Sequence, residues 1–359
     1  MRSRDVKIRA ESNSSAGQER QGMENFETQE VAITEDEAAL YDRQIRLWGL
    51  DAQQRMRNAT VVVVNLKGLG TEIIKNIVLA GIGKLIVVDE NNVTEEDLGA
   101  GFFFTEEDVG KNRAESSRLR IQNLNPRVIV ETVTNFETLH GTELEKLVES
   151  ADLVCVTDRG TEWIIPLNEE CARQKKKFYC GATYGLSGFI FCDLSVHQFL
   201  TKDKTRPGEE PKDIKATMTY PTFSHALQHS WENLSKRQTK ELNPATVFTV
   251  MAILEWQTRH QGQLPDGLST ADELEVLANT LLKDRDVNSQ IIQSIPRHQI
   301  ESAAITAAHE LSPVCAVVGG FLAQDILKAL SAKDPPLANF FTFDGTTGGA
   351  TVCRLGVPR

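Results

Sequence analysis

The chain has 359 residues, of which 40% are hydrophobic and 25% charged, a composition typical of globular rather than disordered or fibrous proteins. Its 39 Lys and Arg against 50 Asp and Glu give a formal net charge of −11. This charge argues against a sequence-independent nucleic-acid binder, which needs a basic face. No uninterrupted apolar run reaches the ~20 residues of a membrane span. The polar residues 1–33 lack the apolar core of a secretory signal, and we expect a disordered tail there on a soluble intracellular protein.

The first predicted helix begins after Thr34, which can form a capping box with Glu37. It continues through AALYDRQIRLW and ends at Gly49. Positions i, i+4 and i+7 form one apolar face, made of Tyr41, Ile45 and Trp48. Arg43 lies two residues after Tyr41, roughly 200° around the helix, so we expect it to project away from that face.

Residues 60–89 predict a β–α–β unit. Val61–Val64 form an unbroken β-branched run, as in a strand buried on both faces of a parallel sheet. The turn NLKGLG and the helix TEIIKNIVLAGI follow, and KLIVVDE is a second strand that ends at Asp89. The unit has about the length that dinucleotide-binding folds use.

The alternation continues, with helices predicted at 111–123, 141–150 and 161–175 and strands at 127–133 and 151–158. The segment FYCGATYGLSGFIFCDL carries strands around glycine turns. The charged, proline-containing residues 201–213 predict a linker. A helical insertion follows, with one helix capped by Asn243 and others at 270–284 and 298–310.

The α/β signal returns with an apolar helix, 312–330, and the strand–turn–strand segment FFTFDGTTGGATVCRL. The helix carries a small-residue patch that suits either core packing or a dimer interface, made of Ala316, Gly319, Gly320 and Ala323. We predict a doubly wound, mostly parallel α/β sheet with a Rossmann-like fold. The expected parts are a tail (1–33), the first part of the α/β domain (34–200), the helical insertion (201–310) and the last part of the α/β domain (311–359).

The turn NLKGLG is a weak phosphate-binding signal. The pattern G-x-G-x-x-G is met only at Gly70, with Gly68 beside it, while Asn65 and Lys67 replace the first two glycines. Either Lys67 supplies a point charge to a phosphate, or the turn packs a helix on a strand without nucleotide. Asp89, 19 residues after Gly70, is either a ribose ligand or a solvated acid.

The six cysteines include no C-x-x-C pair, which removes the usual structural zinc and thioredoxin-type signatures. They are Cys155, Cys171, Cys180, Cys192, Cys315 and Cys353. None lies between Cys192 and Cys315. We expect five of them to be small buried hydrophobes, namely Cys155, Cys171, Cys180, Cys192 and Cys315.

Four segments resemble the ubiquitin-like-protein activating enzymes, which share the adenylation fold of the bacterial ThiF and MoeB enzymes. They are YDRQIRLWG, VVVVNLKGLGTEIIKNIVLAGI, VGKNRAESSRLRIQNLNP and PVCAVVGGFLAQDILKALSAKDPP with the following NFFTFDG. The likeness covers about residues 34–200 and 311–357. It is strongest to the smaller, non-catalytic subunits of the heterodimeric SUMO-activating enzymes.

The resemblance implies a degenerate adenylation site. Active members carry G-x-G-G-I-G where this chain has NLKGLG, and S-N-L-N-R-Q-F where it has EDLGAGF, so Ala100 and Gly101 replace an arginine and a glutamine that serve the nucleotide. Arg113 stands in place of a phosphate-binding lysine, and Asp158 in place of a magnesium-binding aspartate. The resulting pseudo-site, with no metal of its own, consists of Gly68, Gly70, Asp89, Arg113 and Asp158.

The resemblance also implies a partner subunit that carries out the chemistry. In this family the arginine of Y-x-R-Q reaches across the dimer into the partner's ATP site, and Arg43 of YDRQ occupies that position; the other interpretation is an ordinary surface arginine. Catalytic subunits hold the modifier as a thioester on a cysteine of an inserted domain, whereas residues 201–310 contain no cysteine. We therefore expect ATP, Mg²⁺ and the reactive cysteine on the partner subunit.

These observations predict a regulatory subunit of a SUMO-activating heterodimer, inactive alone, that meets SUMO through the complex and, by resemblance, is nuclear. One alternative is a self-sufficient, homodimeric ThiF/MoeB-like adenylyltransferase, against which Ala100 argues. Another is an NAD-dependent oxidoreductase, against which Lys67 and the lack of a placed catalytic histidine or lysine argue. A third is the corresponding subunit for the cullin-directed modifier, which is typically longer.

Overall fold

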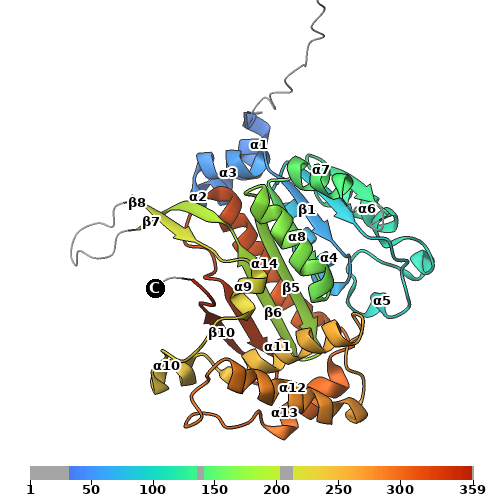
Figure 1. Cartoon of the computed structure of the whole chain (residues 1–359). Helices are drawn as coiled ribbons and strands as arrows, with labels where there is room; N and C mark the ends of the chain where they lie inside the picture. Colours follow the sequence, from blue (N-terminus) through green and yellow to red (C-terminus); the bar gives the residue numbers. More distant parts are fainter. Residues whose placement is uncertain (1–31, 136–140, 203–212, 358–359) are drawn as a thin grey trace, which may run out of the picture. The chain divides into compact units, whose positions relative to one another are not determined.

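A mixed eight-stranded sheet forms the centre of the structure, a computed structural model that describes residues 32–135, 141–202 and 213–357 (Figure 1). The strand order is β10-β9-β6-β5-β4-β1-β2-β3. Strands β1 to β5 are parallel, and β6, β9 and β10 are antiparallel to their neighbours. The predicted doubly wound, mostly parallel sheet is confirmed. Its strands are β1 (Thr60–Val64), β2 (Lys84–Val88), β3 (Ile129–Val133), β4 (Leu153–Thr157), β5 (Lys177–Tyr184), β6 (Ser187–Asp193), β9 (Phe340–Asp344) and β10 (Gly349–Cys353).

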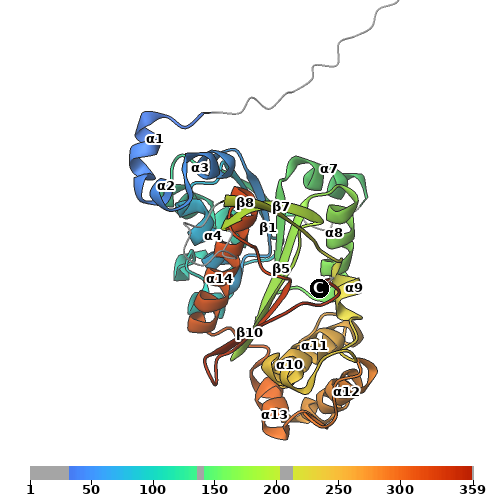
Figure 2. The ribbon, with the colours of Figure 1, turned by 90° about the vertical axis from the view of Figure 1, so that its left-hand side faces the viewer.

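Each face of the sheet buries its own hydrophobic core. In β1, Val61 and Val63 belong to one core and Val62 and Val64 to the other, as the alternation of a strand requires. The first face is covered by α3 (Leu50–Arg57), α4 (Gly68–Leu79), α6 (Arg113–Leu124) and α14 (Ser312–Ser331). The second is covered by α7 (Thr142–Ser150), α8 (Thr161–Arg173) and α11 (Pro244–Arg259). Figure 2 shows α4 and α14 on one side of the sheet and α8 and α11 on the other.

The helices within residues 223–306 of the chain extend the second core. They are α9 (Phe223–Leu227), α10 (Lys236–Glu241), α11, the 3₁₀ turn η2 (Leu268–Thr270), α12 (Ala271–Asp284) and α13 (Arg297–Thr306). Helix α11 contacts β6, β9 and α8, so this helical region rests on the sheet through one long, almost fully buried helix. The short elements α5 (Asp97–Ala100) and η1 (Glu106–Asp108) follow β2.

The N-terminal helix differs from the prediction in two ways. The Thr34–Glu37 capping box is present, but the helix breaks at Tyr41 into α1 (Glu35–Leu40) and α2 (Asp42–Trp48). Helix α3 begins directly after Gly49, where the sequence predicts only the end of a helix. Gly49 has φ +89°, and this left-handed conformation lets the chain turn from α2 into α3.

Two other predictions are wrong in detail. The two ends of the predicted linker 201–213 belong to an antiparallel pair of strands, β7 (Val196–Lys202) and β8 (Asp213–Thr219). The rest of the linker, residues 203–212, lies outside the described residues. Residues 1–31 of the predicted tail do so too. Asn243 precedes α11 as predicted, but its φ is +44° and its amide donates to the Thr246 hydroxyl (2.9 Å) rather than capping the helix.

Helix α14 is, within the described residues, the one helix long and apolar enough to cross a membrane. It packs instead against α4, β5 and β6, and Tyr179 Oη donates to its Asp325 carboxylate at 2.8 Å. A Cβ added to Gly319 would lie 2.7 Å from Glu72 Cβ on α4. The small residues therefore allow the two helices to approach closely within the core.

Candidate functional site

The order of the parallel strands creates a crevice at the carboxyl ends of β1 and β4. The chain runs from β1 through β2 to β3 on one side, then returns to place β4 on the other side of β1. Ligands of doubly wound sheets bind at this kind of switch point. The residues that follow the strands here are Asn65 after β1, Asp89 after β2 and Asp158 after β4.

The two glycines of the turn serve close packing. Helix α4 begins at Gly68, where an added Cβ would lie 2.8 Å from Ala100 Cβ and 3.0 Å from Cys315 Sγ. At Gly70, an added Cβ would lie 2.6 Å from the Asn65 carbonyl oxygen. A side chain at either position would clash with its neighbours, so the structure favours the packing interpretation of NLKGLG.

An internal carboxylate occupies the N-terminus of α4. Both carboxylate oxygens of Glu310 accept from the Gly68 N–H, each at 3.3 Å. The free N–H groups and the helix dipole make such an end an anion site. Glu310 thus places the chain's own negative charge where a phosphate would bind.

Asp158 lies in the same space and carries an unsatisfied oxygen. Its Oδ1 accepts from the Thr183 N–H (3.0 Å), whereas its buried Oδ2 has no hydrogen-bond partner among the described residues. Burial, followed by the negative charge of Glu310, raises the pKa of Asp158, while Lys67 opposes the shift. Burial likewise raises the pKa of Glu310. The charge of Lys67 opposes both pKa shifts, with Arg159 acting on Asp158 and Arg113 on Glu310 as well.

A cavity among the described residues of this crevice is too small for a nucleotide. It measures about 40 Å³, and its lining includes Lys67, Asp158, Thr183, Tyr184, Gln257 and Glu310. Sites for small ligands usually enclose roughly 300–1,000 Å³. Among the described residues, no group of three His, Cys, Asp or Glu side chains is placed to hold a metal. The residues present therefore do not fit Mg-ATP.

Asp89 and Arg113 are engaged in internal bonds. Asp89 is fully buried, and its two carboxylate oxygens accept from the N–H groups of Leu66 (2.6 Å) and Asn91 (2.9 Å). Arg113 is 5% exposed and makes a bidentate pair with Asp97, at 2.9 and 3.0 Å. Its Nη1 lies 3.9 Å from Asp89 Oδ2. Neither residue can serve a ribose or a phosphate without breaking these bonds.

An ion pair also spans the mouth of the crevice. Arg159, next to Asp158 after β4, contacts Glu90, next to Asp89 after β2, with Nη2 2.7 Å from Oε1. Because β1 lies between β2 and β4, this pair crosses the carboxyl end of β1. The Arg159 guanidinium also lies 5.5 Å from the centre of the Trp163 ring. Glu90, Asp97, Arg159 and Glu310 are not among the site residues that the sequence predicts.

Tyr41 fixes the orientation of α2. It is 4% exposed and its hydroxyl accepts from Asn125 Nδ2 at 2.7 Å. A Cβ on Gly81 would lie 2.5 Å from Tyr41 Cζ, so the ring lies directly against this backbone. Arg43 is exposed, as its position opposite Tyr41 predicts.

The Arg43 guanidinium has no hydrogen bond or ion pair with any residue that the structure describes. Three residues later, Arg46 lies 2.9 Å from Asp42 within the same helix. Large apolar side chains near Arg43 in the sequence face solvent, namely Leu40 (61% exposed), Leu47 (76%) and Leu50 (53%). Arg43 is therefore an unpaired cation on a partly apolar surface.

The five cysteines predicted to be buried are buried, and so is Cys353. Burial raises the pKa of each thiol, for example to about 12 in Cys315 and in Cys353. A thioester-forming cysteine needs access to solvent and a lowered pKa. None of the six has either property.

The amino-acid sequence matches the ThiF family over residues 41–358, almost the whole described chain. The chain belongs to the ThiF family. It is 36% identical to SUMO-activating enzyme subunit 1 of Homo sapiens over 349 residues, covering 90% of this chain and 96% of the human one. It is 34% identical to the protein of the same description from Xenopus laevis, with 92% and 99% covered.

Two solved structures share the ThiF fold of this chain. PaaA aligns with a TM-score of 0.55 and 15% identity, covering 94% of this chain and 79% of PaaA. Escherichia coli MccB, solved with succinimide, aligns with a TM-score of 0.51 and 14% identity, covering 88% and 71%. At these identities the likeness concerns the fold alone.

Proposed function

We infer that this chain is the regulatory subunit of a SUMO-activating heterodimer. The relatives that match over nearly their whole length are described as subunit 1 of that enzyme. The observation that carries the inference is the contrast between two sites on this chain. The nucleotide crevice is filled by Glu310, whereas Arg43 extends into solvent without a partner among the described residues.

Within the complex, the partner subunit holds Mg-ATP, adenylates the carboxyl terminus of the modifier and takes the modifier onto its own cysteine. This chain supports those steps without a nucleotide site or a reactive thiol of its own. The small described cavity of about 40 Å³ in the crevice and the burial of all six cysteines support this part of the proposal. We propose that the chain alone is inactive.

Arg43 is the residue we propose to act in trans. A guanidinium is always charged and presents its donors in a planar fork that matches phosphate oxygens. An arginine supplied by a neighbouring chain can stabilise the charge of a transferring phosphoryl group. Tyr41 holds α2 against Gly81 and Asn125, which gives Arg43 a fixed base from which to reach the partner's ATP.

The exposed leucines next to Arg43 support contact with a second protein. Soluble monomers seldom expose large contiguous apolar patches, and such patches mark interaction sites. Leu47, at i+4 from Arg43, is 76% exposed, and we propose that the partner subunit covers it together with Leu40. The same contact would bring Arg43 close to the partner.

Reconstitution tests this function. The chain is purified alone and with its partner subunit, and ATP–pyrophosphate exchange is measured with SUMO and with the cullin-directed modifier. We expect exchange only from the complex and only with SUMO. Exchange by the isolated chain would establish the homodimeric adenylyltransferase instead, and exchange with the other modifier would reassign the pathway. A nuclear location, proposed on family resemblance alone, is tested by imaging the tagged chain.

A further inference from the structure

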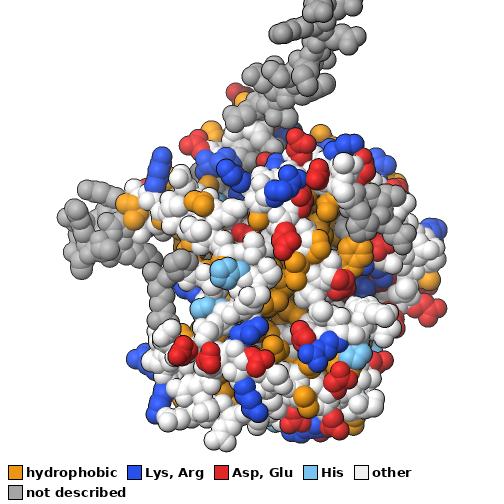
Figure 3. Space-filling view, in the orientation of Figure 1, with side chains coloured by type: hydrophobic (Ala, Val, Ile, Leu, Met, Phe, Trp, Pro, Cys, Tyr) orange, Lys and Arg blue, Asp and Glu red, His pale blue; other side chains and the backbone are white. Residues whose placement is uncertain are grey.

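Helix α2, which carries Arg43, has little apolar attachment to the rest of the fold. Each of its seven residues is described, and none of them is buried. Figure 3 shows Lys and Arg side chains over the end of the molecule that carries α2 and α3, where Arg43, Arg46 and Leu47 are exposed. A helix of this length is not stable in isolation. The direction in which Arg43 points therefore depends on the contacts that hold α2 in place.

The joint between α2 and α3 is a glycine. Gly49 has φ +89°, and no described atom of another residue lies within 4 Å of a Cβ added there. Glycine has the widest backbone freedom of any residue, so this joint by itself does not set the angle between the two helices. A side-chain contact that spans Gly49 sets it instead.

Gln53 of α3 makes this contact. It is fully buried, and its Oε1 accepts a hydrogen bond from Nε1 of Trp48, the last residue of α2, at 3.0 Å. Its Nε2 donates to the carbonyl oxygen of Ala80, at the end of α4, at 2.9 Å. Leaving either group of a buried amide unpaired is unfavourable, so the two bonds together hold Gln53 in one orientation. Gln53 thus links the last residue of α2 to the end of α4.

The C-terminal end of α4 is the common anchor of α2. The last carbonyl groups of a helix have no partner within it. Three successive carbonyl oxygens here accept from amide side chains: Val78 from Asn125 (2.9 Å), Leu79 from Gln44 (3.5 Å) and Ala80 from Gln53 (2.9 Å). Asn125 Nδ2 also donates to the Tyr41 hydroxyl, at 2.7 Å. Both ends of α2 are thus attached to α4, through Tyr41 before Arg43 and through Trp48 after it.

We propose that Gln53 is a positioning residue for Arg43, an inference that rests on the role in trans proposed for that arginine. Gln53 fixes the last residue of α2 while Tyr41 is fixed before its first, so α2 neither pivots nor rotates about its axis. A displacement of about 1 Å in a catalytic arrangement can lower a rate by about 100-fold. Gln53 is 0% exposed, so it acts through Trp48 and α2 and not by contact with the partner's ATP.

Single-turnover adenylation of SUMO by the reconstituted heterodimer tests the proposal. Gln53→Met keeps the length of the side chain and removes both hydrogen bonds, and we expect it to slow adenylation by about tenfold. Trp48→Phe, at a half-buried position, removes only the indole donor and should slow adenylation by roughly threefold. This second variant tests the same contact even where Gln53→Met fails to fold.

A double variant separates positioning from a general structural role. If Gln53 acts through Arg43, then Arg43→Ala with Gln53→Met is no slower than Arg43→Ala alone, because the effects of residues that act as one unit do not add.

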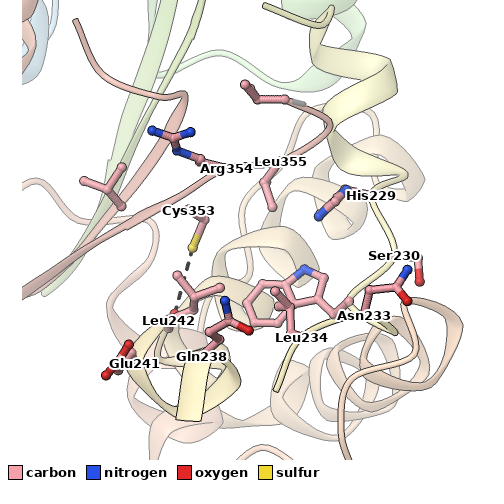
Figure 4. A pocket seen from close by; sticks show the side chains of 13 residues that line it. His229, Ser230, Asn233, Leu234, Gln238, Glu241, Leu242, Cys353, Arg354 and Leu355 are labelled. Atoms are coloured by element: carbon pink, nitrogen blue, oxygen red, sulfur yellow. Dashed lines mark hydrogen bonds between the residues drawn. The ribbon is translucent and has the colours of Figure 1, made fainter. Parts of the chain in front are cut away.

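The matched control is Gln238→Met on α10. Gln238 Oε1 accepts from the N–H (3.0 Å) and the hydroxyl (2.9 Å) of Ser235 in the capping box of α10. Its side chain lines a cavity of about 520 Å³ beside β10 (Figure 4). Figures 1 and 2 show α10 at the lower end of the molecule and α2 at the upper end. Gln238→Met therefore removes two hydrogen bonds of a glutamine far from α2 and should leave the adenylation rate unchanged.

A nitroxide label on α2 measures the positioning itself. The label is attached to the variant Arg46→Cys of the full-length chain, because Arg46 is exposed whereas all six native cysteines are buried. Gln53→Met should increase the mobility of the label in the electron paramagnetic resonance spectrum, and Gln238→Met should not.

The failure of this proposal is distinguishable from the failure of the proposed function. Losses that add in the double variant overturn the positioning role, as does a label whose mobility Gln53→Met leaves unchanged. Normal rates for both Gln53→Met and Trp48→Phe, with a slow Arg43→Ala, overturn the positioning role alone. A normal rate for Arg43→Ala overturns the role of Arg43 in trans and the positioning role with it.

Discussion

The carboxylate of Glu310 accepts a hydrogen bond from the backbone N–H of Gly68, 242 residues away in the chain. The contact joins the segment before α14 to the first residue of α4. It places a carboxyl group of the chain itself at the helix N-terminus, which in an active nucleotide site would receive a phosphate. The nucleotide-binding architecture is thereby retained without its ligand.

Glu310→Gln should change how stability depends on pH. The folded-state pKa of Glu310 is raised by burial, so the folded chain keeps its proton to higher pH than the unfolded chain does. The free energy of unfolding therefore falls as pH rises from about 4, the ordinary glutamate value, through the folded pKa. The Gln variant lacks this loss and should gain stability relative to wild type over that window. Urea unfolding between pH 4.5 and 8 measures it.

The matched control is Glu95→Gln, an exposed glutamate near α5. It should follow the wild-type pH profile. If Glu310→Gln and Glu95→Gln show the same dependence of the free energy of unfolding on pH, burial of the Glu310 charge does not destabilise the folded chain.

Arg43→Ala should slow adenylation of SUMO by the reconstituted heterodimer while leaving assembly intact. Arginines supplied in trans contribute roughly 10³–10⁵ to phosphoryl transfer, so a loss of about 100-fold or more in single-turnover rate is expected. Arg46→Ala, on the same helix but paired with Asp42, is the control and should be near wild type. An unchanged rate for Arg43→Ala would exclude the proposed role.

Asp97→Ala should destabilise the chain by about 3 kcal/mol or more, because it leaves the Arg113 guanidinium buried without its bidentate partner. The double variant Asp97→Ala with Arg113→Met removes the stranded charge and should recover part of the loss. Denaturant unfolding of both variants checks this. A double variant as unstable as the single one would show that packing rather than charge dominates.

Gly70→Ala should destabilise by about 1–3 kcal/mol, since its Cβ would overlap the Asn65 carbonyl oxygen. Gly320, in the interior of α14, has no atom within 4 Å of an added Cβ, so Gly320→Ala should be neutral or stabilising by about 0.5–1 kcal/mol. Thermal unfolding midpoints of the isolated chain compare the two. Equal effects would contradict the packing interpretation of the turn.

Replacing this chain's cysteines one at a time should leave the SUMO thioester on the partner subunit. Each thiol is buried and its pKa is raised, so none can attack the adenylate. Non-reducing gels of the reconstituted reaction locate the thioester. A modifier bound to this chain would require a reactive cysteine that opens from the core.

The fold could be predicted because its signals are local. The valine run of β1 and the capping box at Thr34 each depend on neighbours a few residues away, and both are present. Arg43 is exposed as helix geometry predicts, although of the predicted apolar face only Tyr41 is buried, while Ile45 and Trp48 are half-buried. The contents of the crevice could not be predicted in this way, because Glu310 reaches Gly68 from a distant segment and Arg159 reaches Glu90 across β1. The position of Asp97 was partly predictable, because Thr94 and Asp97 have the spacing of a capping box. The Thr94 N–H does donate to the Asp97 carboxylate.

A ligand stabilises a fold only while it is present, by an amount set by its concentration relative to its dissociation constant. Glu310 is covalently part of the chain and cannot be diluted, exchanged or hydrolysed. The N-terminus of α4 is therefore occupied by the chain's own carboxylate whatever the cellular supply of ATP. If the partner subunit binds ATP as proposed, the two halves of the heterodimer would differ in their response to that supply.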